Sequence, residues 1–216
     1  MRTYDDPCGI ARALDHVGER WALLIVRELL LGPKRFTDLR AGLPTAGQNV
    51  LSQRLRELED SQLVRRRKLP PPAASWVYEL TERGLELEPV VLALARWGSR
   101  MPMRSTNSLG VDALALALRS TFDAEAARGF EARVDLRLGA DRLLAQVSPA
   151  GFTLTRRGAA MEPDPEVDAV LETDADMLRG LVFTGRSLDC DGVRVEGDRG
   201  IVLRFLELFP RPAMSS

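Results

Sequence analysis

The spacing of apolar residues changes near residue 100, and this change limits the folds open to the chain more than any other feature. Before it, apolar residues recur at helical spacing, and residues 21–31 are apolar almost all round until a Gly-Pro pair ends the run. After it, residues 131–138 alternate strictly between apolar and charged side chains, which predicts a half-buried strand. Because a domain averages roughly 150 residues, the 216-residue chain has room for two small domains. We expect domains at residues 1–100 and 110–216, with a linker at 101–109.

The first part of the chain predicts a helical domain that ends in a hairpin. Leu51, Leu55 and Leu58 recur at helical spacing, and a Pro-rich loop separates two strand-like segments. Thr81 is a candidate N-cap for a helix in which Pro89 should introduce a bend. The expected elements are helices at residues 8–17, 21–31, 36–41, 47–60 and 81–97, and strands at residues 63–69 and 76–80.

The second part predicts an antiparallel sheet with helices. An amphipathic helix at residues 111–122 precedes the strands. Thr173 is a candidate N-cap for a helix at 174–183, and Asp198 for a last helix that runs to residue 209. The expected fold class is therefore α+β. The expected strands cover residues 131–138, 142–147, 152–156 and 169–172.

Composition excludes several classes of protein. The longest runs without a charged residue span 13 residues, whereas a membrane helix needs about 20 apolar residues, and the acidic N-terminal segment is unlike a signal peptide. Two cysteines, Cys8 and Cys190, cannot form a disulfide framework, and the lone histidine, His16, leaves no zinc pattern. The glycine motifs of nucleotide-binding proteins and the hydrolase motif G-x-S-x-G are absent. We therefore expect a cytoplasmic protein that is not an enzyme, holds no metal or cofactor and has no membrane partner.

The charge is divided unevenly between the two parts. The first 104 residues carry 17 Lys and Arg against 13 Asp and Glu, a net charge of +4, whereas the rest carries 13 against 18, a net charge of −5. A positive first part can approach a polyanion. Because this part also contains a helix, a turn, a second helix and a hairpin in that order, the sequence predicts a winged helix-turn-helix domain that binds double-stranded DNA.

The second helix of this motif has one face for the core and one for DNA. When the leucines face the core, Asn49, Gln53 and Arg56 point the opposite way. Amide side chains pair with adenine and arginine pairs with guanine, while the four successive cations at 65–68 suit phosphates or a narrow minor groove. The candidate DNA-binding residues are Arg35, Gln48, Asn49, Ser52, Gln53, Arg54, Arg56, Arg65, Arg66, Arg67 and Lys68.

Several segments of the first part resemble the HxlR-type winged-helix regulators, over about residues 5–100. The resemblance implies a bacterial transcription factor that forms a homodimer through its first and last helices. In some members a cysteine at the position of Cys8 is a redox sensor. Because cysteine is often buried, we expect Cys8 to be a small buried packing residue, with the redox sensor as the alternative. The family commonly begins its recognition helix with an Ile-Ser pair, where this chain has Ala46 and Gly47. The matching segments are Cys8-Gly-Ile-Ala-Arg-Ala-Leu-Asp15, Glu19-Arg-Trp-Ala-Leu-Leu-Ile25, Arg27-Glu-Leu-Leu-Leu-Gly-Pro33, Arg35-Phe-Thr-Asp-Leu39, Leu51-Ser-Gln-Arg-Leu-Arg-Glu-Leu58 and Tyr78-Glu-Leu-Thr-Glu-Arg-Gly84.

The last part resembles the sterol carrier protein type two fold over about residues 110–210. The resemblance rests on Leu171-Glu-Thr-Asp-Ala-Asp-Met-Leu178 and Asp191-Gly-Val-Arg-Val-Glu-Gly-Asp198, and it departs where Asp189-Cys190-Asp191 replaces part of a longer helical connection. It implies a sheet backed by helices around an apolar tunnel, and hence an apolar small-molecule effector, whereas the same side chains can also fill a core. The candidate pocket residues are Leu114, Leu118, Phe122, Met177, Leu181 and Phe183. The alternative function for the chain is a lipid-like carrier, or an interaction module whose winged helix contacts protein rather than DNA.

Overall fold

The computed structural model describes residues 3–71, 73–102, 107–158 and 166–210. The chain divides into two compact units, Met1–Val91 and Leu92–Ser216. The division falls within helix α6 (Glu88–Gly98), ahead of the expected linker, of which residues 103–106 lie outside the described part. The later half of α6 belongs to the second unit, where Arg96 Nε donates a hydrogen bond of 2.9 Å to the Ser120 carbonyl.

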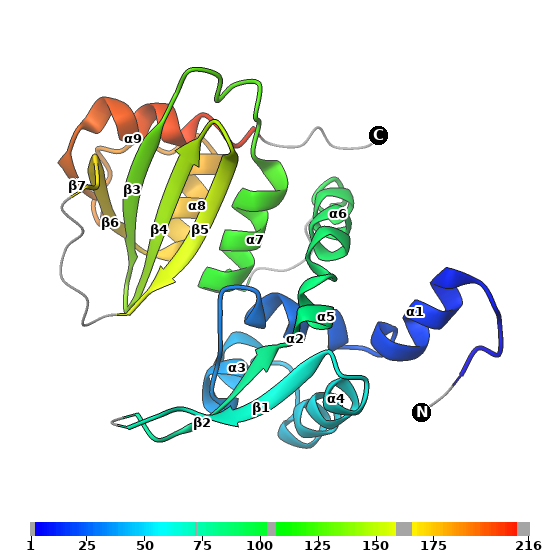
Figure 1. The fold of residues 1–216 in the computed structure, drawn as a ribbon. Helices are drawn as coiled ribbons and strands as arrows, with labels where there is room; N and C mark the ends of the chain where they lie inside the picture. Colours follow the sequence, from blue (N-terminus) through cyan, green and yellow to red (C-terminus); the bar gives the residue numbers. More distant parts are fainter. Residues whose placement is uncertain (1–2, 72, 103–106, 159–165, 211–216) are drawn as a thin grey trace. The chain divides into compact units, whose positions relative to one another are not determined.

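The first unit contains helices and a two-stranded hairpin, in the order that the sequence predicts (Figure 1). Its core is built around α2, where Ile25 and Val26 are fully buried. The leucines of α4 face this core as predicted, since Leu51, Leu55 and Leu58 are all buried. The elements are α1 (Gly9–Val17), α2 (Ala22–Leu29), α3 (Phe36–Gly42), α4 (Gln48–Asp60), β1 (Val64–Lys68), β2 (Trp76–Leu80) and α5 (Glu82–Leu85).

The prediction of one bent helix at residues 81–97 was wrong. The segment forms two helices, α5 and α6, of which α5 begins at the predicted cap, because the Thr81 hydroxyl accepts a hydrogen bond of 3.0 Å from the Gly84 N–H. Pro89 lies in the first turn of α6 instead of inside a longer helix. A first-turn residue has no N–H partner within the helix, so proline is tolerated there.

The second unit contains a five-stranded sheet with strand order β5-β4-β3-β6-β7. Figure 1 shows α8 behind this sheet, and α9 packs against β3 and β6. The helix that begins at Val111 and the last helix begin where the sequence predicts them. The elements are α7 (Val111–Thr121), β3 (Ala132–Leu138), β4 (Asp141–Ser148), β5 (Gly151–Arg157), β6 (Ala169–Thr173), α8 (Ala175–Phe183), β7 (Arg194–Gly197) and α9 (Arg199–Leu206).

The sheet is mixed, so the expectation of an antiparallel sheet was wrong. Strands β3 and β6 pair in parallel, with Leu136 opposite Leu171, while the other neighbours pair antiparallel. Alternation of apolar and polar residues predicts that a segment is a strand but not the direction of its neighbour. The short edge strand β7 was not predicted.

Strand β3 is more buried than its alternation indicates. Val134 and Leu136 face the helices and are fully buried, but Asp135, on the opposite face, is buried as well. Its carboxylate accepts hydrogen bonds from Arg142 Nη2 at 2.6 Å and from Arg137 Nε at 3.2 Å. The long arginine side chains that pair with Asp135 therefore replace water on this face.

The sequence predicted the N-cap of α9 correctly but not that of α8. Asp174, and not Thr173, caps α8, because its carboxylate accepts a hydrogen bond of 2.7 Å from the Met177 N–H. Asp198 caps α9 as predicted, with hydrogen bonds from the N–H groups of Gly200 and Ile201. This last helix ends at Leu206, before the expected residue 209.

Candidate nucleic-acid interface

Helix α4 presents a polar face on the side opposite its buried leucines. Gln48, Asn49, Gln53 and Arg56 are exposed, and Ser52 is half-buried beside them. Gly47 is the N-cap and supplies no side-chain hydrogen bond, while Ala46 is buried just before it. The positions predicted for base contacts therefore share one exposed helical face.

Contacts along the helix order several of these side chains. Gln53 Nε2 donates to Glu57 Oε1 at 3.0 Å, and Arg56 Nε donates to the Ser52 carbonyl at 3.3 Å. From α3, Arg40 Nη1 reaches Gln48 Oε1 at 3.3 Å. These contacts are exposed, so a competing donor or acceptor can replace them at little cost.

Arg54 differs from the other candidates on α4. Its side chain is only 14% exposed and pairs with Glu57 and with Glu19. The structure thus commits its guanidinium to contacts inside the first unit. Helical spacing indicates the pair with Glu57, three residues further along α4, but it does not reveal Glu19, which lies in a distant segment.

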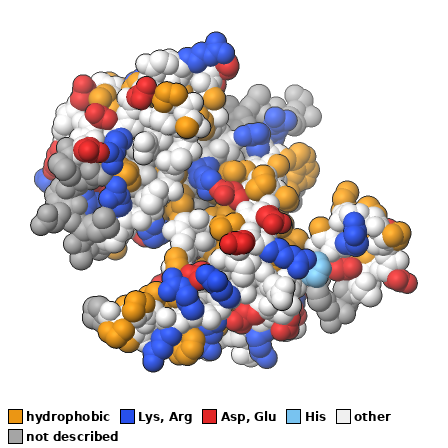
Figure 2. Space-filling model, in the orientation of Figure 1, with side chains coloured by type: hydrophobic (Ala, Val, Ile, Leu, Met, Phe, Trp, Pro, Cys, Tyr) orange, Lys and Arg blue, Asp and Glu red, His pale blue; other side chains and the backbone are white. Residues whose placement is uncertain are grey.

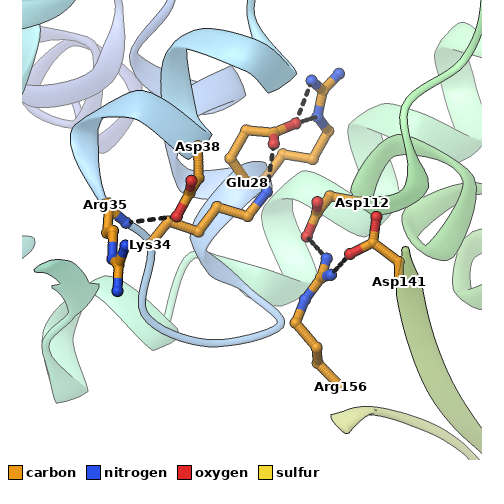
Figure 3. A network of polar contacts seen from close by, with 8 residues as sticks. Glu28, Lys34, Arg35, Asp38, Asp112, Asp141 and Arg156 are labelled. Atoms are coloured by element: carbon orange, nitrogen blue, oxygen red, sulfur yellow. Dashed lines mark hydrogen bonds and ion pairs between the residues drawn. The ribbon is translucent and has the colours of Figure 1, made fainter. Parts of the chain in front are cut away.

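Arg35 connects the start of α3 to the end of the hairpin loop. Its backbone N–H donates to Asp38 Oδ2 at 3.1 Å, which caps α3 (Figure 3). Its Nε donates to Ser75 Oγ at 3.1 Å. The candidate Arg35 therefore contacts the hairpin loop.

Two of the hairpin arginines share one carboxylate. Glu79 of β2 lies opposite Arg65 in the sheet register, and it accepts hydrogen bonds of 2.7 Å from Arg65 Nε and from Arg67 Nε. Burial acts to raise the pKa of Glu79, but the hydrogen bonds and charges of Arg67 and Arg65 outweigh it and lower the pKa below its usual value. The carboxylate is therefore ionised at neutral pH.

The other two hairpin cations, Arg66 and Lys68, lie on the face of the hairpin opposite to Arg65 and Arg67. The Arg66 guanidinium is 4.6 Å from the centre of the Trp76 ring and 5.9 Å from that of Tyr78. The aromatic rings hold this arginine by cation–π attraction. Lys68 is exposed near the loop. Figure 2 shows Lys and Arg side chains around the hairpin and α4, with apolar side chains at the hairpin tip.

The exposed thiol of Cys8 lies at the start of α1, at the N-cap position. The backbone N–H groups of Ala11 and Ile10 lower its pKa below the ordinary value. The expectation that Cys8 is a small buried packing residue was therefore wrong for this chain.

Helices α1 and α6 each expose large apolar side chains. Ile10 of α1 is 72% exposed and Trp97 of α6 is 60% exposed. Val90 and Leu94 of α6 are about half exposed. Such side chains on one helix are unusual for a surface that faces only water.

The predicted pocket residues of the second unit differ in burial, and they do not together line the hollow that opens between α8 and α9. Leu114 and Leu118 of α7 and Leu181 of α8 are buried, while Met177 and Phe183 are half-buried. Phe122 stacks on Phe152, with 5.1 Å between the ring centres, in a cluster that also contains Phe205 and Phe209. A hollow of about 410 Å³ opens between α8 and α9, and of the six predicted residues Leu181 lines it.

The sequence alone did not reveal the ion pairs that position these elements. In the second unit, Arg156 of β5 pairs with Asp112 of α7 and Asp141 of β4, so that it joins α7 to the sheet (Figure 3).

Among the described residues, no group of His, Cys, Asp and Glu is arranged to hold a metal, and no helix is long and apolar enough to cross a bilayer.

Known proteins resemble the first part of the chain. The HxlR-like helix-turn-helix family matches residues 16–106. The uncharacterized regulator YvaP of Bacillus subtilis is 38% identical over 88 residues, 41% of this chain and 82% of that protein. The transcriptional regulator YodB of the same bacterium is 36% identical over 88 residues, 41% of this chain and 79% of that protein. Both names describe regulators rather than enzymes.

Solved structures of such regulators also match. The redox regulator HypR in its oxidized form is 33% identical, covering 44% of this chain and 99% of that one, with a TM-score of 0.42. Quinone-bound YodB from B. subtilis is 33% identical, covering 43% and 97%, with a TM-score of 0.37. Given the identity to YvaP and YodB over most of their length, this chain belongs to the HxlR-like helix-turn-helix family of transcriptional regulators.

Proposed function

We propose that the chain acts in the cytoplasm as a homodimer that binds double-stranded operator DNA through α4 and the β1–β2 hairpin. The observation that carries the proposal is the exposed face of α4, where Asn49, Gln53 and Arg56 lie opposite buried leucines. An α-helix fits the major groove, and amide and guanidinium groups recognise the edges of adenine and guanine there.

The hairpin supplies the positive charge for backbone contacts. Its four cations, with Arg35 at the foot of the loop, suit phosphates, which give affinity but no sequence information. Gln48 and Ser52 flank the base-reading residues. Arg54 is left out of the proposed interface, because its guanidinium already pairs with Glu57 and Glu19.

We also propose that α1 and α6 form the homodimer contact. Their exposed apolar side chains, Ile10, Leu94 and Trp97 among them, would be removed from water by a second copy of the chain. A dimer places two recognition helices on one duplex, so the operator would contain two related half-sites.

Cys8 is the proposed redox-sensitive residue of this regulator. Its thiol is exposed and its pKa is lowered, so that more of it is the reactive thiolate at neutral pH. Relatives whose structures match are named as a redox regulator and as a quinone-bound regulator. An oxidant would convert the Cys8 thiolate to a sulfenic acid, which can go on to form a disulfide.

The second unit is proposed to bind an apolar effector in the manner of a sterol carrier-like domain. Its sheet backed by helices supports this assignment. The hollow beside Leu181 does not, because charged side chains line it as well, Arg186, Asp189 and Arg199 among them. Thermal unfolding in the presence of fatty acids, sterols and aromatic metabolites tests it, because a ligand of the folded state raises the melting temperature. No shift with any of them would favour a filled core.

Selection of duplexes from a random-sequence pool tests the DNA-binding function. The proposal expects a recurring sequence to be enriched, and its affinity to fall with salt with a log–log slope of about −0.9 for each phosphate contacted. If the purified chain retains no duplex, the alternative, in which the winged helix contacts protein, is favoured instead.

A further inference from the structure

An acidic side chain lies at the centre of the most basic element of the protein. The Glu79 cluster, which consists of Glu79, Arg65 and Arg67, joins the two strands of the hairpin. The Glu79 side chain is 12% exposed, whereas those of Arg65 and Arg67 are 65% and 41% exposed. The carboxylate therefore lies inside and both guanidiniums lie outside.

The donor atoms in this cluster are the same for both arginines. Each uses its Nε–H, at 2.7 Å from a separate oxygen of Glu79. A guanidinium has five N–H donors, four of them on the Nη atoms. Among the described residues these Nη groups of Arg65 and Arg67 donate to no acceptor. They remain available to a further anion.

The two guanidiniums are also spaced along one strand. Arg65 and Arg67 are two residues apart on β1, so they project from the same side of the hairpin, roughly 6–7 Å apart along the strand. The Glu79 carboxylate already fixes the rotamers of both arginine side chains. The binding of an anion therefore costs little further side-chain entropy. Arg66 projects from the other side and is held by Trp76 instead.

On charge alone, Glu79 would weaken the binding of DNA. Removing its negative charge would raise the affinity of the hairpin for any duplex, whatever the sequence. A carboxylate that orders two arginines has the opposite effect, since its loss frees both side chains. The sign of the effect of neutralising Glu79 therefore distinguishes the two roles.

We infer that Glu79 is a positioning residue, which holds Arg65 and Arg67 so that their Nη groups together bind the phosphates of one DNA strand. This inference rests on the proposed function, since it assigns to the hairpin a particular part of DNA binding. Lys68, a cation of the same hairpin outside the Glu79 cluster, contributes charge alone.

The experiment measures the affinity of the full chain for a duplex selected by the wild type, by fluorescence anisotropy. The variant Glu79→Gln removes the charge but keeps the size of the side chain. Glu82→Gln, at an exposed position of α5, makes the same change of charge outside the cluster. We expect Glu79→Gln to weaken binding about five- to tenfold although it makes the chain more positive. We expect Glu82→Gln to leave binding unchanged or to strengthen it slightly.

A second variant separates positioning from folding. Arg65→Lys with Arg67→Lys keeps both charges but loses the planar guanidinium fork. We expect it to weaken binding to a similar degree, and we expect Glu79→Gln to add little on that background. Circular dichroism of each variant of the Glu79 cluster should show the wild-type helix content, because the substituted residues lie on strands β1 and β2 and not in a helix.

The outcomes of this experiment are distinct. If the wild type binds no duplex, the proposed function fails. If the wild type binds and Glu79→Gln binds equally or more tightly, the function stands and the inference about Glu79 is overturned. Equal losses in Glu79→Gln and Glu82→Gln would overturn it as well.

Discussion

The Lys34 ammonium lies 2.7 Å from the Glu28 carboxylate, inside the first unit, where the Glu28 side chain is only 2% exposed. Arg27 pairs with the same carboxylate at 2.6 Å (Figure 3). Lys34 also exchanges two backbone hydrogen bonds with Tyr78 of β2. Glu28 of α2 therefore joins the central helix to the hairpin, and Gly42 of α3 leaves room for its carboxylate, since a Cβ there would overlap it.

Replacement of Glu28 by alanine should strongly destabilise the first unit. The change leaves the largely buried Lys34 without its carboxylate, and loss of one partner of a buried pair costs about 3–5 kcal/mol. Urea unfolding followed by circular dichroism measures the change. The control is Glu125→Ala, which breaks an exposed pair with Arg128 and should cost less than about 1 kcal/mol. Equal costs for both variants would show that burial of the Glu28 pair contributes nothing.

The stability of the first unit should depend on pH through Glu79. Because the folded-state pKa of Glu79 is lower than its usual 4.5, its contribution is present above pH 4.5 and is lost as the pH falls through the folded pKa. Wild type and Glu79→Gln should therefore differ in free energy of unfolding at pH 7, and the difference should shrink as the pH falls below 4.5. A difference that stays constant with pH would contradict this.

Glu59 should change the stability of the first unit with pH in the direction opposite to Glu79. Burial raises its pKa above 4.5, although the charge of Arg66 opposes this. A raised carboxylate pKa makes the folded state less stable as the pH rises through the interval above 4.5. Relative to wild type, Glu59→Gln should gain stability between pH 4 and pH 7, as measured by urea unfolding at each pH. A loss over that interval would contradict the assignment.

A charge on the apolar side of α6 should dissociate the proposed homodimer. Trp97→Asp places a carboxylate where a second copy would cover the ring, and the unpaired charge would be costly to bury. Sedimentation equilibrium should show the wild type as a dimer and the variant as a monomer. Leu203→Asp, at an exposed position of α9, should remain a dimer. A monomeric wild type would remove α1 and α6 from the proposed interface.

Cys8 should react with iodoacetamide faster than Cys190 near neutral pH. Its pKa is lowered by the Ala11 and Ile10 N–H groups, and the thiolate is the reacting form. Labelling of Cys8→Ser and Cys190→Ser at several pH values assigns each rate. If peroxide changes the DNA affinity of the wild type and of Cys8→Ser alike, Cys8 is not the sensor.

The sequence predicted the fold best where one periodicity decides the structure. Leu51, Leu55 and Leu58 have the spacing of a helix with one buried face, so α4 was predicted correctly, as was the exposure of Asn49, Gln53 and Arg56 on it. The parallel pairing of β3 with β6 was missed, because alternation carries no information about strand direction.

The contacts of individual charged residues were less predictable. Arg65, Arg67 and Glu79 come together only because β1 and β2 pair in one register, and a shift of one residue would separate them. Likewise, Arg54 is adjacent to exposed positions, but tertiary packing brings Glu19 of a different segment to it. Pair contacts between distant segments follow from the assembled fold.

The most direct test of the account is the affinity of Gln53→Ala and Arg56→Ala for a duplex selected by the wild type. Both side chains are exposed on α4 and distant from its leucines, so both variants should unfold at the wild-type temperature. Each should lose about 1–3 kcal/mol of specific affinity, whereas Arg128→Ala, which removes an exposed cation of the second unit, should bind as the wild type does. Wild-type affinity in both α4 variants would contradict the claim that this helix reads DNA.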